Sequence, residues 1–302
     1  MYMVKLSATD GILTPTLIGA GIALALGVII LIVFKLFAVP VDERAAKLSE
    51  LLPGVNCGGC GFASCMAYAE ALVDGLVTET TMCTAGGEET VKAIADYLGV
   101  APGIFIPQTA HVYCQGSNQF TRNRFSYTGS ANCAAATGLF SGPNSCTYGC
   151  LGMGDCIAVC DFNAVYIEDG IARINSENCV ACGKCVEACP KSLIQLIPKH
   201  EAATIVTCSN HWPASRILRD CSIACIACRL CVRTCPVDAI KMDDNLAVID
   251  QTLCTHCGDC IEICPTTAIR SGLIGPPGSY KASARSKPIA SGKKGKGDTA
   301  AS

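Results

Sequence analysis

The distribution of apolar and polar residues separates an N-terminal segment from the rest of the chain. The stretch LIGAGIALALGVIILIVF at 17–34 is almost wholly apolar, and no charged residue lies between positions 11 and 34. This length matches the roughly 20 residues that span a bilayer. A cleaved signal peptide has a shorter apolar region after a basic start, whereas here only Lys5 precedes the stretch and Asp10 offsets it. We expect one transmembrane anchor over residues 1–39.

Two later segments alternate apolar and polar residues with the period of a β-strand. AVYIEDGIARIN begins at Ala164 and AIKMDDNLAVID begins at Ala239, and each has a polar turn pair in its middle. Alternation around such a pair predicts a β-hairpin. Apolar residues at 63–76 instead have helical spacing. Beyond 275 the chain is rich in Gly, Ser, Lys and Pro and has little to bury, so 275–302 is predicted to be a disordered tail.

The 24 cysteines among 302 residues change this picture most. Most of them lie two to four residues apart, too close to link distant segments as a disulfide framework does. CVACGKCVEACP at 179–190 and CTHCGDCIEICP at 254–265 have the spacing C-x2-C-x2-C-x3-C-P, which is typical of iron–sulfur cluster loops. Zinc sites more often combine two separate C-x2-C pairs. The runs therefore predict [4Fe-4S] clusters in a reducing compartment.

The first cysteine region follows the anchor directly. It contains four thiols, enough for one complete cluster site, in a predicted domain over 40–110. The third thiol is expected near the start of a helix, where the positive end of the helix dipole stabilises a thiolate. These candidate ligands are Cys57, Cys60, Cys65 and Cys83.

The remaining cysteines repeat at an offset of 75 residues. Nine cysteines between 133 and 189 have counterparts between 208 and 264, and the two predicted hairpins match at the same offset. Such agreement predicts two duplicated ferredoxin-like modules, at 111–200 and 201–274. The predicted fold class is therefore α+β, with one membrane helix, a small four-cysteine domain and two two-cluster modules.

In two-cluster ferredoxins the cysteine before the proline ligates the other cluster. This rule gives three regular ligand sets: Cys160 with Cys179, Cys182 and Cys185; Cys264 with Cys225, Cys228 and Cys231; and Cys235 with Cys254, Cys257 and Cys260.

One site departs from the rule. Met153 stands where the repeat expects a cysteine, so Cys150, Cys156 and Cys189 need a fourth ligand, either Cys146 or Cys114. Asp161 also replaces the usual proline after Cys160, which we expect to weaken the local turn.

Five sites use twenty cysteines and leave four. If Cys146 completes the irregular site, the remainder are Cys114, Cys133, Cys208 and Cys221; if Cys114 completes it, Cys146 takes its place among them. Either remainder could hold a further metal centre between the modules, and the alternative is four buried thiols. We therefore expect five [4Fe-4S] clusters, with a sixth as an open alternative.

The order of these parts resembles the B subunit of the Rnf complex, the membrane-bound, ion-translocating ferredoxin:NAD oxidoreductase. The resemblance rests on the anchor, CGGCGFASC at 57–65 and CTYGCLGMGDC at 146–156. It implies electron input from soluble ferredoxin and relay to partner subunits that hold the flavins, the NAD site and the Na⁺ or H⁺ path. The chain itself shows no dinucleotide-binding motif and no catalytic constellation, and no nucleic-acid partner is expected.

Charges near the anchor indicate its orientation. Lys35, Arg44 and Lys47 follow the apolar stretch, so the positive-inside rule places the cluster domains on the cytoplasmic side of the cell membrane and the N-terminus outside. An acidic ferredoxin would need a local basic dock, for which Arg122, Arg124 and the lysine tail are candidates. Two alternatives stay open, namely an electron-transfer subunit of another anchored reductase and a zinc-binding structural scaffold.

Overall fold

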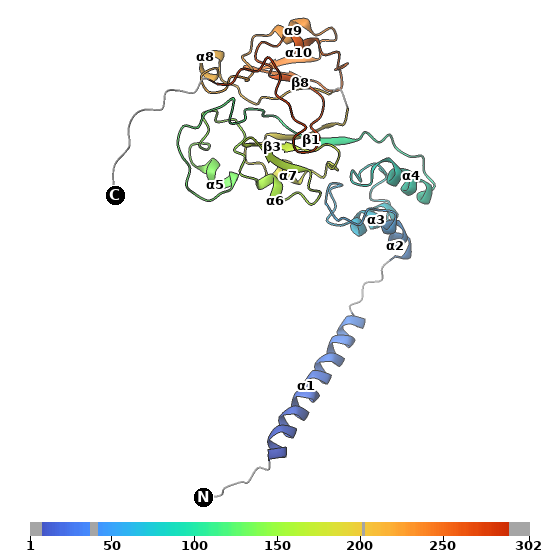
Figure 1. Cartoon of the computed structure of the whole chain (residues 1–302). Coiled ribbons are helices and arrows are strands. Elements are labelled where there is room, and N and C mark those ends of the chain that lie inside the picture. Colours follow the sequence, from blue (N-terminus) through green and yellow to red (C-terminus); the bar gives the residue numbers. More distant parts are fainter. Residues whose placement is uncertain (1–7, 37–41, 201–202, 290–302) are drawn as a thin grey trace, which may run out of the picture.

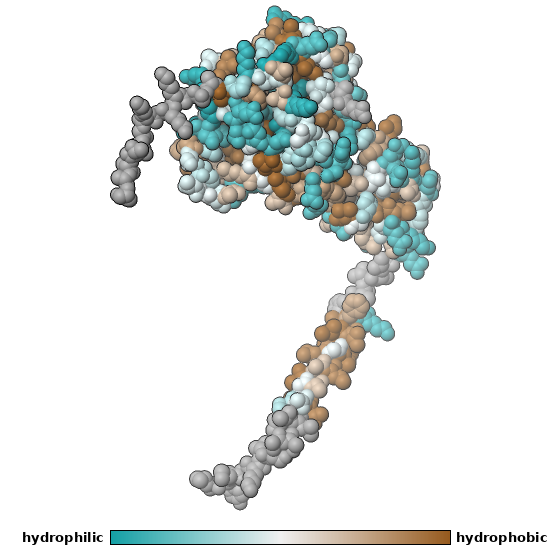
Figure 2. Space-filling view, in the orientation of Figure 1, coloured by the Kyte–Doolittle hydropathy of each residue, from teal (hydrophilic) through white to brown (hydrophobic). Residues whose placement is uncertain are grey.

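The computed structural model describes residues 8–36, 42–200 and 203–289 of the chain. Helix α1, Ala8–Leu36, extends away from the folded part in Figure 1. Its segment Pro15–Leu36 has a mean hydropathy of 3.0, and none of it is buried against the protein. Figure 2 shows this surface as mostly brown, with paler patches between the brown ones. By length and composition, α1 is able to cross a membrane.

A small helical unit follows the anchor. It comprises α2 (Glu43–Glu50), α3 (Cys65–Val73) and α4 (Gly87–Leu98). The Ser64 hydroxyl caps α3 by accepting a hydrogen bond from the Ala67 N–H at 3.1 Å, as expected for an N-cap residue. Cys65 is therefore the first residue of a helix, which confirms the expectation for this thiol. The core of the unit consists of Leu48, Leu52, Tyr68, Ala69, Leu72, Cys83 and Ile94.

Four two-stranded antiparallel sheets form the framework of the remaining chain. Both predicted hairpins are confirmed, because β2 pairs with β3 and β6 pairs with β7. The other two sheets join strands distant in sequence, β1 with β4 and β5 with β8. The strands are β1 (Gln108–Val112), β2 (Val165–Glu168), β3 (Ile171–Ile174), β4 (Ile194–Pro198), β5 (Thr204–Val206), β6 (Ile240–Asp243), β7 (Leu246–Ile249) and β8 (Ile269–Ser271).

Short helices complete each half. Four of them follow cysteine loops, namely α6 (Asp155–Ala158), α7 (Lys184–Ala188), α9 (Leu230–Thr234) and α10 (Asp259–Ile263). The other two are α5 (Cys133–Gly138) and α8 (Ala214–Ile217). The second half lies over the first in Figure 1. An apolar cluster that includes Phe120, Ile217 and Ile223 packs where the two halves meet. The observed class is α+β.

The segment that follows β8 does not behave as a disordered tail up to residue 289. The Tyr280 ring lies under the Arg173 guanidinium, with 3.1 Å between the guanidinium carbon and the ring centroid. Arg285 donates hydrogen bonds of 2.6 Å to the carbonyls of Ile261 and Glu262. For these residues the prediction of disorder is wrong, because the composition hid specific contacts of Tyr280 and Arg285. The rest of the predicted tail lies outside the described residues.

Candidate metal centres

The four cysteine loops of the two halves share one backbone conformation. In each loop the second and fourth residues after the first cysteine have positive φ. Successive left-handed residues turn the chain tightly, so that several N–H groups point into one concave space. The irregular loop keeps this conformation although Met153 replaces a thiol. The residues concerned are Gly152 and Gly154, Ala181 and Gly183, Ala227 and Arg229, and His256 and Gly258.

The residue three positions after each closing cysteine also has positive φ. This holds for Asn163 with φ 50°, as it does for Ser192, Asp238 and Thr267. Asp161 therefore leaves the turn unchanged, contrary to our expectation, and its carboxylate instead forms a 2.6 Å ion pair with Lys184. In two of these turns a backbone N–H donates a hydrogen bond to the sulfur of the closing cysteine. The Ala164 N–H donates to Cys160 Sγ and the Leu193 N–H donates to Cys189 Sγ, both at 3.4 Å.

Site I contains the four thiols that follow the anchor. Cys57, Cys60, Cys65 and Cys83 line one cavity. Burial raises the pKa of Cys83, and the other three thiols raise it further. The side-chain oxygen of Asn56 accepts a hydrogen bond from the Cys65 N–H at 2.8 Å, which fixes the loop against the start of α3.

Site II combines Cys160 with the loop cysteines Cys179, Cys182 and Cys185, and these four also line one cavity. Burial, followed by the neighbouring thiols, raises the pKa of Cys185 to about 12. The N–H of Ala110 donates to Cys179 Sγ at 3.3 Å. Such N–H···S contacts favour the charged state of a cluster ligand.

Site IV, in the second half, has the same plan. Cys225, Cys228, Cys231 and Cys264 line a cavity, and burial followed by the other three thiols raises the pKa of Cys231 to about 11.

Site V comprises Cys254, Cys257 and Cys260, with Cys235 at the position that matches Cys160. Burial, followed by the thiols of Cys231, Cys254 and Cys257, raises the pKa of Cys260 to about 12.

Site III, the irregular site, has a neighbouring thiol that the sequence analysis did not consider for it. After burial, the thiols of Cys150, Cys133 and Cys189 raise the pKa of Cys156 to about 12. Cys133 is held there by Asp155, whose carboxylate accepts hydrogen bonds from the N–H groups of Cys133 at 2.7 Å and Ala134 at 3.0 Å. The neighbouring fourth thiol is therefore Cys133, at the start of α5.

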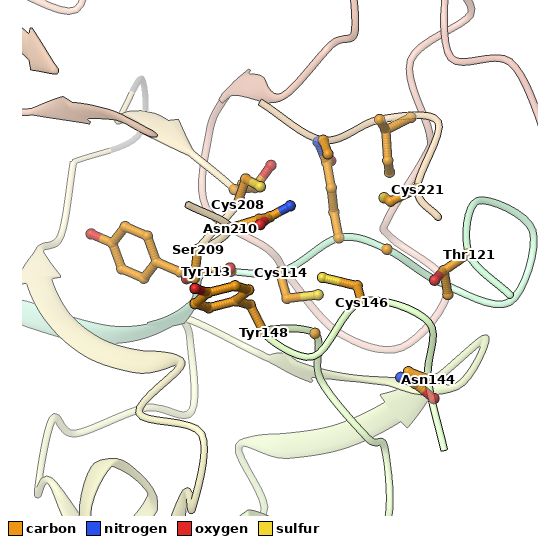
Figure 3. Close-up of a pocket in the computed structure, with 16 residues that line it drawn as sticks. Tyr113, Cys114, Thr121, Asn144, Cys146, Tyr148, Cys208, Ser209, Asn210 and Cys221 are labelled. Atoms are coloured by element: carbon orange, nitrogen blue, oxygen red, sulfur yellow. Dashed lines mark hydrogen bonds between the residues drawn. The ribbon is translucent and has the colours of Figure 1, made fainter. Parts of the chain in front are cut away.

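The two candidates that the sequence offered for site III lie in a neighbouring cavity, although Cys114 Sγ also accepts a hydrogen bond from the Cys150 N–H of site III at 3.4 Å. Cys146 and Cys114 line a separate cavity together with Cys208 and Cys221, as Figure 3 shows. We call these four residues the junction set. Both sets of four leftover cysteines considered in the sequence analysis included Cys133. The set that lines this cavity contains Cys114 and Cys146 together and lacks Cys133.

The repeat misled the sequence analysis at this point. The offset of 75 residues matches Cys133 with Cys208, whereas the strand registers match Cys114 with Cys208. Val112 pairs with Ile194 in β1–β4, and Val206 pairs with Ile269 in β5–β8. Cys114 and Cys208 each lie two residues beyond these valines. The alternation in AHVYC at 110–114 and TIVTC at 204–208 was a signal that could have identified this match.

The donor chemistry of these sites fits iron–sulfur clusters. Each of sites I, II and IV surrounds its cavity with four thiols, and N–H groups point at the sulfur atoms in site II. Among the described residues, no three His, Cys, Asp or Glu side chains converge closely enough to hold a single metal ion. Because burial raises the pKa of Cys83, Cys185 and Cys231, cluster binding must displace protons from these thiols, as is general for thiolate ligands.

The sites form a spatial sequence. Burial raises the pKa of Cys182 in site II, and the Lys184 N–H opposes this shift. The Cys57 thiol of site I raises the pKa of Cys182 further. The Cys156 thiol of site III likewise raises the pKa of Cys185 in site II. The Cys231 thiol of site IV raises the pKa of Cys260 in site V. Thiols of adjacent sites are thus close neighbours from site I to site III and from site IV to site V.

Arg124, which the sequence analysis named, and two histidines have structural surroundings away from the cysteine loops' thiols. Arg124 donates hydrogen bonds to the carbonyls of Phe140 at 2.7 Å and Asn144 at 3.0 Å, so its guanidinium braces a loop. His256 accepts a hydrogen bond from the Thr204 N–H at 3.2 Å. Burial, with Arg173 nearby, lowers the pKa of His111 to about 4.

Several cysteine sites in ferredoxin-type folds beside an apolar helix define a membrane-associated iron–sulfur electron-transfer protein. Family models agree with this class. A model described as "Putative Fe-S cluster" matches residues 52–84. Models described as "4Fe-4S dicluster domain" match residues 142–190, 172–242 and 224–268.

Relatives identify the family. The chain is 41% identical over 250 residues, 82% of its length and 74% of the relative, to the B subunit of the Na(+)-translocating ferredoxin:NAD(+) oxidoreductase complex of Acetobacterium woodii. It is 37% identical over 237 residues, 78% of its length and 83% of the relative, to the B subunit of the proton-translocating ferredoxin:NAD(+) oxidoreductase complex of Clostridium ljungdahlii. The B subunit of the ion-translocating oxidoreductase complex of Methanosarcina acetivorans is 38% identical over 79% of this chain and 90% of its own. The chain belongs to the family of Rnf complex B subunits, the iron–sulfur electron-transfer subunits of ion-translocating ferredoxin:NAD oxidoreductases.

Proposed function

We propose that this chain is the electron-input subunit of its complex, which takes electrons from reduced ferredoxin and passes them to flavin- and NAD-bearing partner subunits. The observation that carries the proposal is the spatial sequence of cysteine sites, which leads from an exposed end toward the anchor. Of the 24 cysteines, only Cys228 in site IV and Cys257 in site V are exposed. A soluble donor requires a centre near the surface, so sites IV and V are the input end.

Sites I to V supply the ligands for five [4Fe-4S] clusters under this proposal. Cys133 serves as the fourth ligand of site III. When bound, each cluster accepts and gives up one electron at a potential tuned by burial, charge and hydrogen bonds to sulfur. The two halves are interpreted as duplicated two-cluster modules, because α7 and α10, β2 and β6, and β3 and β7 all match at the offset of 75.

Charge on the second half supports this input end. Arg229 and Arg233 lie on the exposed side of the site IV loop and of α9. The matching positions of the first half are Gly154 and Ala158, so these cations are specific to the second half. Basic side chains around an exposed centre attract an acidic protein donor and raise its association rate.

The membrane side follows from the same arrangement. Lys35, Arg44 and Lys47 after the apolar segment favour cytoplasmic placement of the cluster domains, where soluble ferredoxin is available. The two relatives named for their coupling ion differ, one in Na⁺ and one in H⁺. The coupling ion is therefore a property of the partner subunits in this proposal.

The input end can be tested by charge reversal. Arg229→Glu combined with Arg233→Glu should slow reduction of the anaerobically purified protein by reduced ferredoxin about tenfold at low salt. The matched control reverses Lys47 and Lys92, two exposed lysines of the anchor-proximal unit, and should leave the rate unchanged. Reduction by dithionite should be equal in all three proteins. If only the control variant is slow, ferredoxin docks at the anchor-proximal unit and the proposed direction is wrong.

A further inference from the structure

The loop of site I lies directly against the loop of site II, and the contact is at Gly59. This residue belongs to the small helical unit after the anchor, which lies beside the first half in Figure 1. A Cβ atom at position 59 would lie 3.0 Å from the Cα atom and 3.5 Å from the Cβ atom of Cys182, and 3.0 Å from the hydroxyl oxygen of Thr84. The absence of a side chain therefore lets the two loops approach this closely.

The backbone of Gly59 does not itself require glycine. Its neighbours Gly58 and Gly61 have positive φ, at 79° and 85°, whereas Gly59 lies outside the left-handed region. A residue with a Cβ atom can therefore occupy this position without the strain of a left-handed conformation. The close approach of Cys182 is what favours glycine here.

Thiols of the two sites meet at this contact. Burial raises the pKa of Cys182, and among the neighbouring thiols Cys57 of site I raises it most. Cys160 and Cys179 raise it less, although both belong to site II itself. Cys182 therefore lies at the edge of site II that faces site I.

The first half carries a positive charge at this contact, whereas the second half carries a negative one at the matching place. The hydrogen bond to Asp161 raises the pKa of Lys184 most, and the thiols of Cys182 and Cys57 raise it further. The ammonium thus lies near both sites, where it offsets the negative charge of their thiolates. At the offset of 75 residues Asp259 stands in place of Lys184.

The matching cysteines also differ in exposure. Cys182 is half-buried, whereas Cys257 in the second half is exposed. The two loops share one backbone conformation, with positive φ at matching residues. The loop around Gly59 lies on Cys182, and the described part of the chain places no such loop on Cys257.

We propose that Gly59 is a positioning residue for electron transfer between sites II and I, because its lack of a side chain sets the distance between them. One electron passes from site II to site I in this step, and no bond forms or breaks. The rate of electron tunnelling falls steeply with distance, so a side chain between the loops slows the step without changing any ligand. The contact is independent of the proposed function, whereas its use in electron transfer rests on that function.

Magnetic interaction between reduced clusters tests the contact without ferredoxin. The anaerobically purified full chain is reduced with dithionite and measured by low-temperature EPR, in which neighbouring reduced clusters broaden each other's signals. Cys57→Ala combined with Cys60→Ala removes site I and shows how much of the broadening involves it. Gly59→Val should keep the wild-type iron content and lose most of that broadening. The matched control, Ala63→Val, adds the same side chain at an exposed position of the same loop and should leave the spectrum unchanged.

The transfer step is measured by rapid freezing after mixing with reduced ferredoxin. Gly59→Val should delay reduction of site I at least about tenfold relative to site II. The midpoint potentials should stay at their wild-type values, which separates a change in distance from a change in the surroundings of a cluster. Ala63→Val should show the wild-type rate. If ferredoxin fails to reduce the wild type, the proposed function is wrong, and the dithionite spectra still decide whether the contact exists.

Wild-type broadening and a wild-type rate in Gly59→Val, at full iron content, would overturn the proposal. If Gly59→Val does not retain iron in site I, Gly59→Ala decides, because its single Cβ atom requires the neighbours to move by only a few tenths of an ångström. Gly59→Ala should keep its iron and lose part of the broadening, so an unchanged spectrum would contradict the proposal. Loss of iron from site I in both variants would show that glycine serves ligand binding and not spacing, and would also overturn it.

Discussion

Sites III and IV occupy matched positions in the two halves, yet only one of them has a complete cysteine loop. The loop of site IV contains Cys228, whereas that of site III contains Met153 at the same place. Both loops nevertheless have positive φ on either side of this position. The backbone conformation therefore does not depend on the middle thiol of the loop.

In the proposed ligand assignment, a thiol from a longer connection replaces the missing one. Between Cys114 and Cys146 the chain runs 32 positions, whereas between Cys208 and Cys221 it runs 13, so the first half has 19 more. The additional length carries α5 with Cys133 at its start. Longer surface connections cost little in stability, so a ligand moved to such a connection preserves the rest of the module.

The strongest test of this comparison exchanges the two ligands. Cys133→Ala should remove the cluster of site III and about four irons per chain. Adding Met153→Cys in that background should restore them, because the loop already has the conformation found in site IV. Iron analysis and EPR of the anaerobic proteins provide the measurement.

Met153→Cys alone is the control and should leave the iron content unchanged. If Cys133→Ala retains full iron, or if the added cysteine fails to rescue it, Cys133 is not the ligand that distinguishes the halves.

Local patterns in the sequence predicted the regular sites, because their ligands lie within a single short loop or at a fixed repeat position. The two hairpins, and the start of a helix at Cys65, could be predicted for the same reason. Cys133 and Cys114 could not be placed by spacing, because an insertion between them broke the repeat. The pairing of Val112 with Ile194 and of Val206 with Ile269 reveals the match. The contacts of Tyr280 depend on distant residues, so composition alone gave the wrong answer there.

A second difference between the halves concerns the strands before the junction set. His111 in β1 corresponds by register to Ile205 in β5, and both side chains are buried. Burial first, and then Arg173, lowers the pKa of His111 from 6.5 to about 4. A histidine whose pKa is lower in the folded state contributes stability above pH 6.5 and loses it as the pH falls toward 4. We expect a loss of about 1 kcal/mol per pH unit below 6.5.

His111→Ile makes the first half like the second and should remove this acid sensitivity. Anaerobic calorimetry at pH 7.5 and 5.5 compares the two proteins. The wild type should lose a few degrees of Tm more than the variant between these pH values. A variant that loses as much as the wild type would show that other groups cause the acid sensitivity.

The smallest expected effect concerns the residue after the last Cys-Pro pair of each half, which is Lys191 in the first half and Thr266 in the second. The Lys191 ammonium donates hydrogen bonds to the carbonyls of Ser141 and Thr147. Burial lowers the pKa of Lys191, and the thiol of Cys146 is the first group that opposes this shift.

A positive charge near a cluster favours the reduced, more negative state. Lys191→Met should therefore make the potential of the nearest centre more negative by roughly 40 mV, which corresponds to about 1 kcal/mol for one electron. Lys199→Met, at an exposed position, should leave all potentials unchanged in an EPR-monitored redox titration. If Lys191→Met shifts no potential, the Lys191 charge does not tune a cluster. The side chain then serves only to hold the carbonyls of Ser141 and Thr147.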